Sequence, residues 1–163
     1  MNRTELMAEG MSLVERGKYK EAVEIFNEIL TEDPQDVEAW INKGCALLYL
    51  EKPRESLHCT NKALEIDLNN TIALNNKGIA LFRINDFEGA EDAFNKTLEI
   101  DPKYAEAWYN KACLASEQKK VYEALRNLEK ALSLDRNRFL THAKIDRHLD
   151  NIRNEARFKE LVD

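Results

Sequence analysis

The sequence has few of the residues that interrupt helices. Its 163 residues include only 5 Gly and 3 Pro, while 44% are hydrophobic and 33% are charged. This length suits one domain of ordinary size, and low Gly and Pro together with abundant Ala, Leu, Glu and Lys is typical of helices. We therefore expect an all-α fold.

Cysteine is scarce, and its pattern matches no disulfide framework. The three residues, Cys45, Cys59 and Cys113, are odd in number and form no C-x-x-C or Cys/His ligand pair. This usage favours a reducing compartment, so we expect a cytoplasmic protein. No apolar segment follows Met1 and no run of 18 apolar residues occurs. A signal peptide, a membrane span and a membrane partner are therefore not expected.

Runs of basic residues are also missing. The net charge is −6 and the pI is about 5.3. A phosphate backbone is repelled by an acidic surface, so no nucleic-acid partner is expected. The basic residues near the C-terminus are interrupted by Asp135 and Asp146 and are interpreted as a solvated face.

The sequence contains no recognisable catalytic or cofactor motif. Neither G-x-G-x-x-G nor G-x-x-x-x-G-K-[ST] is present, and no histidine falls where it would activate Cys45 or Cys113,. His58 and Cys59 are adjacent, so on a helix their side chains diverge. These patterns predict a protein that is not an enzyme and that binds no cofactor.

One set of residues has the spacing of metal ligands. His142, Asp146 and Asp150 follow one another at intervals of four. They would share a helical face only if one helix continued through Asp150. We favour surface pairing and expect no metal site.

What the sequence does contain is a repeat of 34 residues, which appears when the chain is aligned with itself,. Trp40 and Trp108 lie two periods apart, as do Pro34 and Pro102. The repeating sets are Asp33, Asp67, Asp101 and Asp135; Leu30, Leu64, Leu98 and Leu132; and the pairs Asn42-Lys43, Asn76-Lys77 and Asn110-Lys111. The units are 3–36, 37–70, 71–104 and 105–138, followed by a tail at 139–163.

Within each unit, numbered 1 to 34, the apolar pattern predicts two helices. Positions 4, 8 and 11 share one face, and positions 20, 24, 27 and 28 share another,. The break falls near position 15, where Gly17 and Asn85 can adopt a left-handed conformation. Pro53 suits a first helical turn, and Asp36 and Asn70 are predicted N-caps.

The signature residues of these units resemble the tetratricopeptide repeat, which also has 34 residues. They are Gly10, Ala22, Phe26 and Pro34 in the first unit, Trp40 and Gly44 in the second, and Gly78, Ala90, Phe94 and Pro102 in the third. The resemblance covers residues 3–138 and implies a right-handed superhelical solenoid of antiparallel helix pairs. Thr60 replaces a large residue, so looser packing is expected around it.

The tail is expected to cover the apolar end of the last unit with two capping helices. The first is predicted from Phe139 to about Ile145. Asn154 is the predicted cap of the second, which holds Phe158 and Leu161,. This tail shows no repeat in its sequence.

In the family that the chain resembles, the first helix of each repeat lines a concave groove. Here, the corresponding residues occupy positions 2, 5, 6, 9, 12 and 13. The candidate groove residues are Glu38, Glu106, Ile41, Asn75, Tyr109, Asn42, Asn76, Asn110, Cys45, Ile79, Cys113, Phe82, Tyr49 and Arg83.

The asparagines at position 6 give the sharpest functional hypothesis. An amide side chain offers donors and an acceptor that match a peptide unit, so Asn42, Asn76 and Asn110 could hold an extended chain. The series is similar to the asparagine ladder of the O-linked N-acetylglucosamine transferase repeats and of peptide-receptor repeats. The alternative is that these asparagines bond neighbouring helices, and the sequence leaves both open.

Another binding mode of the family is the carboxylate clamp for chaperone C-termini. It needs Lys at position 5 and Asn at 9, then Asn at 6, then Lys at 2 and Arg at 6 in successive repeats. Those slots hold Met7, Met11, Asn42, Ile72 and Asn76, or, one repeat later, Ile41, Cys45, Asn76, Glu106 and Asn110. The basic residues are missing, so we reject a chaperone-tail clamp.

The predicted function is therefore that of an adaptor that binds a peptide segment in the groove. Apolar anchors would contact Tyr49, Phe82 and Tyr109, and basic flanks would face Glu38 and Glu106. The alternative is a scaffold that assembles a complex, or weakly self-associates, through its repeat ends. A helical-repeat nucleic-acid binder would need a basic wall, and among the candidate groove residues only Arg83 is basic.

Overall fold

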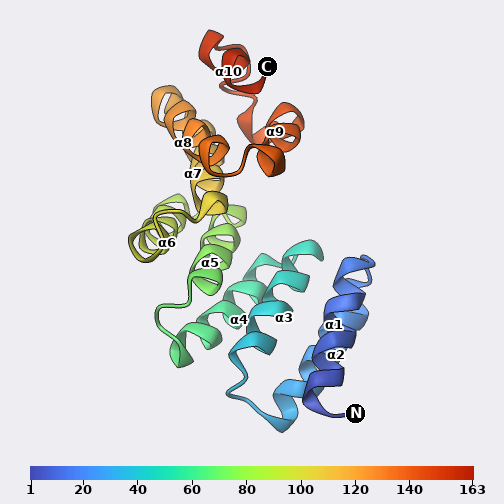
Figure 1. The fold of residues 1–163 in the computed structure, drawn as a ribbon. Coiled ribbons are helices and arrows are strands. Elements are labelled where there is room, and N and C mark those ends of the chain that lie inside the picture. Colours follow the sequence, from blue (N-terminus) through green and yellow to red (C-terminus); the bar gives the residue numbers. More distant parts are fainter. The chain divides into compact units, whose positions relative to one another are not determined.

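The computed structural model describes residues 1–163 and contains only helices and turns (Figure 1). The helices are α1 (Arg3–Glu15), α2 (Tyr19–Glu32), α3 (Val37–Tyr49), α4 (Pro53–Ile66), α5 (Thr71–Arg83), α6 (Phe87–Ile100), α7 (Ala105–Glu117), α8 (Val121–Leu134), α9 (Arg136–Ile145), the 3-10 turn η1 (Arg147–Leu149) and α10 (Ala156–Val162). The predicted all-α fold is confirmed. No helix combines the length and apolarity needed to cross a bilayer.

The chain forms two compact units, residues 1–90 and 91–163. In the first unit, α1 pairs with α2 and α3 with α4, and each pair packs onto the next helix along the chain. The first helices α1, α3 and α5 are neighbours. In the second unit, α7 pairs with α8, η1 packs on α7, and α9 and α10 pack on α8.

The 34-residue period of the sequence is also found in the backbone conformation. After the first helix of each pair, one residue has a positive φ: Gly17 (72°), Glu51 (57°), Asn85 (63°) and Lys119 (58°). The next N–H closes the helix end, as in the bond of 2.8 Å from Lys18 to the Leu13 carbonyl. The left-handed conformation at Gly17 and Asn85 is confirmed. At Glu51 and Lys119 the same closing bond offsets the steric cost that a side chain brings.

Most of the predicted helix starts are confirmed. The Asp36 carboxylate accepts the Ala39 N–H at 2.9 Å, the Asn70 side chain caps α5, and α4 begins at Pro53. The prediction for Asn154 is wrong, because α10 follows Glu155 and has no side-chain cap.

The first helix of the tail also begins earlier than predicted. The Asp135 side chain accepts the Arg138 N–H at 3.1 Å, so α9 begins at Arg136 rather than at Phe139. The side-chain cap, rather than the first apolar residue, therefore sets where α9 begins.

Small residues at position 8 allow the two helices of a pair to approach closely. A Cβ atom built on Gly10 would lie 2.5 Å from Cε1 of Phe26, well inside van der Waals contact. A Cβ atom on Gly44 would lie 3.3 Å from Cβ of Cys59 and 3.5 Å from Cγ2 of Thr60. The shorter Thr60 side chain thus leaves more room in its pair, in line with the expectation from the sequence.

The two tryptophans explain why Trp and Pro recur together. The Trp40 indole N–H donates to the Pro34 carbonyl at 2.9 Å, and Trp108 makes the same bond to Pro102. Trp40 also packs against the apolar clusters that contain Phe26 and Ile41. Each indole therefore fixes the turn that precedes its helix, and the Trp40 ring also fills space between helices,.

Candidate functional site

The candidate groove residues divide between the two compact units. Residues Glu38 to Tyr49 lie on α3 and residues Asn75 to Arg83 lie on α5, so most candidates belong to the first unit. The others, from Glu106 to Cys113, lie on α7 in the second unit. The helices α3 and α5 are neighbours. We call the candidate residues on these two helices the α3–α5 face.

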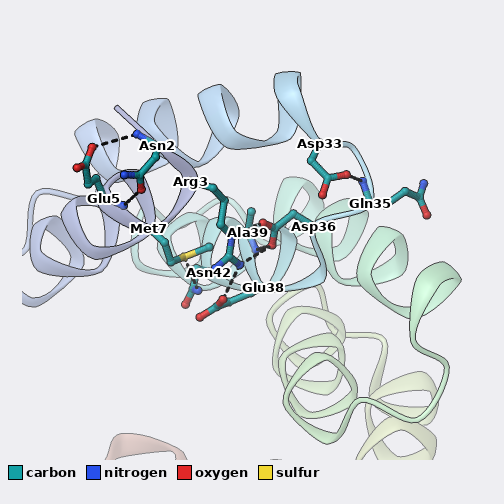
Figure 2. Close-up of polar contacts among 10 residues, drawn as sticks. All are labelled: Asn2, Arg3, Glu5, Met7, Asp33, Gln35, Asp36, Glu38, Ala39 and Asn42. Carbon is teal, nitrogen blue, oxygen red and sulfur yellow. Dashed lines mark hydrogen bonds and ion pairs between the residues drawn. The ribbon is translucent and has the colours of Figure 1, made fainter.

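Asn42 lies on this face with its side chain half-buried. Its Nδ2 atom donates to Sδ of Met7 at 3.5 Å (Figure 2), and its Oδ1 atom accepts no hydrogen bond within the chain. A thioether is a weak acceptor. The Asn42 amide can therefore bind a ligand at little cost to the fold.

Asn76 is more enclosed, with 8% of its surface exposed. Its side-chain amide forms no hydrogen bond within the chain, and both its oxygen and its nitrogen remain accessible to solvent. The residue that corresponds to Met7 one repeat later is Ile41, which offers no acceptor. Asn75 differs, because it has no exposed surface at all. Of the two asparagines, Asn76 is the one that reaches solvent.

The apolar candidates of the α3–α5 face differ in exposure. Ile41 is buried, and Cys45 and Ile79 are half-buried. Tyr49 is 56% exposed and stacks on Tyr19 with a ring separation of 4.6 Å. Phe82 packs against Phe87 at 5.9 Å and is also half-buried. The face thus offers partly exposed apolar side chains beside the two amides.

Arg83 has a structural partner on the neighbouring helix. Its Nη1 atom donates to the Leu48 carbonyl at 2.7 Å and lies 3.3 Å from Oε1 of Glu51. The guanidinium therefore closes the C-terminal end of α3, where the helix dipole favours a cation.

Glu38 is bound by Arg3 from α1. The Arg3 guanidinium donates to Glu38 at 2.6 Å and to Oδ2 of Asp36 at 2.7 Å (Figure 2). The hydrogen bond from Arg3 lowers the pKa of Asp36 against the opposing effect of burial. A basic ligand would have to compete with Arg3 for Glu38.

On α7, the tail covers two of the candidates. The Tyr109 hydroxyl donates to Oδ2 of Asp146 at 2.9 Å, and its ring stacks on Phe139 at 4.9 Å. Cys113 lies 3.6 Å from the same carboxylate oxygen and is 4% exposed. Burial raises the pKa of Tyr109 and of Cys113, with a further contribution from Asp146.

The other two candidates on α7 are placed differently. Glu106 is paired with Arg138 of α9, and Asn110 is half-buried. The α7 candidates are thus engaged mainly with the C-terminal segment of the chain.

One contact of the tail was not predicted from the sequence. The Asn151 side chain donates to the Ser116 carbonyl at 3.0 Å, which repeats the contact between Arg83 and Leu48 two periods later. The donors occupy position 13 and the acceptors occupy position 12 when the register of 34 is extended past residue 138. The tail therefore keeps this contact of the repeat, although its sequence does not repeat.

The possible metal ligands do not share a helix. The helix α9 ends at Ile145, and Asp146 bonds Tyr109 while Asp150 pairs with Arg153. No group of three or more potential ligands is close enough to hold a metal ion.

Two shallow hollows lie away from the candidate groove residues. One, of about 310 Å³, is bordered by α3 and α4. The other, of about 470 Å³, lies beside Trp108 and α8. Neither is lined by a candidate groove residue.

Comparison with known proteins agrees with this repeat organisation. Models of the tetratricopeptide repeat match residues 3–44, 37–70, 71–104 and 93–126. No curated protein sequence matches the chain.

Several solved structures have a similar fold. A thermophilic TPR protein of Thermus thermophilus, TTC0263, is 17% identical with a TM-score of 0.84, over 98% of this chain and 86% of that one. YrrB, described as a TPR protein with an unusual peptide-binding site, is 29% identical with a TM-score of 0.69, over 83% and 70%. The first TPR of Spaghetti (RPAP3), bound to the HSP90 peptide SRMEEVD, is 26% identical with a TM-score of 0.63, over 74% and 90%.

Proposed function

Because the chain belongs to the tetratricopeptide repeat family, whose fold supports protein–protein interaction, we propose that it is an adaptor for an extended peptide. The peptide is a segment of another protein, and it lies along the α3–α5 face. Peptide-binding proteins such as YrrB are among the similar structures, which supports this choice.

The observation that carries the proposal is that the side-chain amides of Asn42 and Asn76 are left available for a ligand. Asn42 and Asn76 lie on neighbouring helices, and neither amide has a strong partner within the chain. A peptide unit offers one N–H and one C=O, which an asparagine amide can match in both directions. Two such contacts would fix the backbone of a ligand whatever its side chains are.

Apolar contacts would add to these hydrogen bonds. Cys45, Ile79 and Phe82 are half-buried, and Tyr49 is exposed but held by its stacking on Tyr19. A ring that is already fixed loses little freedom when a ligand packs against it. We therefore expect ligands to combine an extended backbone with apolar side chains.

We propose that a free C-terminal carboxylate is not part of what is recognised. The slots for its basic partners hold Met7, Met11 and Ile72. RPAP3 binds an HSP90 peptide, but its likeness to this chain does not supply those charges. Free-acid and amidated forms of one peptide should therefore bind equally, whereas a marked preference for the free acid would contradict the proposal.

The test starts with peptides selected from a random library on the full chain. Replacing both Asn42 and Asn76 by Ala should weaken the selected peptides about 10- to 100-fold, since each hydrogen bond contributes about 0.5–1.5 kcal/mol. The matched control replaces Asn27 and Asn61, which lie on α2 and α4, and should change affinity less than about twofold,. Circular dichroism checks that helicity is kept. Equal affinities for all three proteins would remove the support for the proposal.

A scaffold that self-associates is the second candidate, and one feature favours it. Leu68 is 68% exposed and Ile72 is 48% exposed where α4 turns into α5. Apolar side chains in such a position are typical of contact surfaces. In light scattering over a concentration series, self-association that is lost in Leu68→Ser/Ile72→Ser would favour the scaffold, and a monomer at every concentration would exclude it.

We also propose that the chain is non-catalytic and acts in the cytoplasm, with no nucleic-acid partner. All three cysteines are free thiols. Burial raises the pKa of Cys59 to about 11 and raises that of Cys113, so neither is a ready nucleophile,. The net charge of −6 disfavours a nucleic acid,.

A further inference from the structure

The residue that follows each repeating asparagine is a lysine, and in the second repeat this lysine borders a hollow. Lys43 lies with Arg54 and His58 around a depression of about 310 Å³ between α3 and α4. Lys43 and Asn42 are adjacent on α3, so their side chains point in different directions. The hollow is therefore a different surface from the α3–α5 face.

The cations around this hollow are not neutralised by the chain. Nζ of Lys43 lies 5.1 Å above the Trp40 ring, and His58 meets the same ring edge-on at 6.1 Å. Arg54 is exposed and forms no ion pair. The one carboxylate of the hollow, that of Glu55, is held by Lys52 at 2.9 Å.

The base of the hollow is apolar. Leu47 is 3% exposed and Cys59 is 1% exposed. The Cys59 thiol is neutral at ordinary pH, because burial raises its pKa to about 11. The hollow therefore combines an uncharged base with a cationic rim.

The pair of Lys43 and Arg54 occurs in the second repeat alone. The corresponding positions hold Glu9 and Lys20 in the first repeat, Lys77 and Glu88 in the third, and Lys111 and Tyr122 in the fourth. The fourth repeat instead places a second cation, Arg126, at the position of His58. In a chain with a net charge of −6, the two cations Lys43 and Arg54 at one hollow make a local field opposite to that of the whole,. The repeat pattern alone does not account for them.

We propose that this hollow binds an acidic segment of a partner protein, with carboxylates on Lys43 and Arg54 and an apolar side chain over Leu47. Carboxylate is a matched acceptor for guanidinium and ammonium groups, and the uncharged base suits a leucine-like side chain. The site lies beyond the proposed peptide-binding face, so a partner could use both.

The test uses the peptide fluoresceinyl-Glu-Glu-Leu-Glu-Glu-amide, with the dye on the N-terminal amine, titrated into the full chain with fluorescence anisotropy as the readout. Lys43→Gln/Arg54→Gln should weaken binding about tenfold or more, and added salt should weaken binding to the unaltered chain. The control Arg16→Gln/Lys20→Gln removes the same charge from exposed sites just after α1 and on α2 and should cost less than about twofold,. Equal losses in both variants would mean general attraction only and would overturn the proposal.

A second experiment separates a loss of the binding site from a loss of folding. Lys43→Glu/Arg54→Glu should lose the acidic peptide and gain the analogue in which lysine replaces glutamate. Asn42→Ala/Asn76→Ala should bind the acidic peptide as the unaltered chain does, which separates this site from the proposed function. The proposal is overturned if no peptide binds, if the reversed pair does not bind the lysine analogue, or if a single-stranded oligothymidylate binds more tightly than the acidic peptide.

Discussion

The Arg83 guanidinium donates a hydrogen bond of 2.7 Å to the backbone carbonyl of Leu48. The only basic residue among the candidate groove residues therefore ties α5 to the end of α3. This contact gives Arg83 a structural role before any ligand is present. Asn42 and Asn76, in contrast, have no strong hydrogen-bond partner within the chain.

Replacing Arg83 by Ala should lower the free energy of unfolding by about 1–2 kcal/mol, because a charge-assisted hydrogen bond to a helix end is lost. Urea unfolding measures the effect. Arg16→Ala, at an exposed site without a side-chain partner, is the control and should be nearly neutral. Equal effects of the two substitutions would show that the contact contributes nothing.

Gly10→Ala should destabilise the protein by about 1–3 kcal/mol, because the new Cβ would meet the Phe26 ring,. Gly44→Ala should cost less than about 1 kcal/mol, because the new Cβ would lie 3.3 Å from Cβ of Cys59 and the helix preference of alanine offsets part of that crowding,. Thermal unfolding of both variants checks the difference. A loss at Gly44 as large as that at Gly10 would contradict the packing described for the two pairs.

Asp146→Ala should loosen the tail from α7. It leaves the buried Tyr109 hydroxyl without its acceptor, at a cost of about 1–3 kcal/mol,. The labelling rate of Cys113, measured with Cys45 and Cys59 replaced by Ser, should rise. Asp150→Ala, which removes an exposed partner of Arg153, should leave the rate unchanged. Slow labelling in both variants would mean that Asp146 does not hold the tail.

The ion pair between Arg3 and Asp36 should make the free energy of unfolding depend on pH in the acidic range. The pKa of Asp36 is lowered from 3.8 in the folded chain, so its contribution is complete above that value and disappears as the pH falls through the folded pKa,. Asp36→Asn keeps the N-cap and removes the charge.

The variant should be less stable than the unaltered chain at neutral pH. The difference should be no more than about 1 kcal/mol, because Arg3 is half-exposed, and it should shrink as the pH falls below 3.8 and through the folded pKa of Asp36,. Urea unfolding over a series of pH values from neutral to acid measures it. A constant difference would contradict the linkage.

The sequence was sufficient to predict most local features of the fold. The 34-residue period placed the helix pairs, and Gly17, Asp36 and Pro53 marked helix ends because each has an intrinsic preference for that position,. Glu51 and Lys119 have no such preference. Their left-handed backbone follows from the closing hydrogen bonds of the helix end, which the sequence does not display.

The candidate site was less predictable, because burial depends on distant segments. Asn75 and Asn76 are adjacent and chemically identical, yet only Asn76 reaches solvent. Tyr109 is covered by residues of the tail, whose sequence shows no repeat. The contact of Asn151 with Ser116 could not be predicted from residue identity, because it needs only a hydrogen-bond donor at that position and asparagine replaces arginine there.

The central claim is that Asn42 and Asn76 hold the backbone of a peptide ligand. Calorimetric titration of a selected peptide and its alternately N-methylated form, into the unaltered chain and into Asn42→Ala/Asn76→Ala, tests it most directly. N-methylation should weaken binding to the unaltered chain about tenfold or more and should have little further effect on the variant, since the contacts it removes are already lost. The same loss in both proteins would contradict the account.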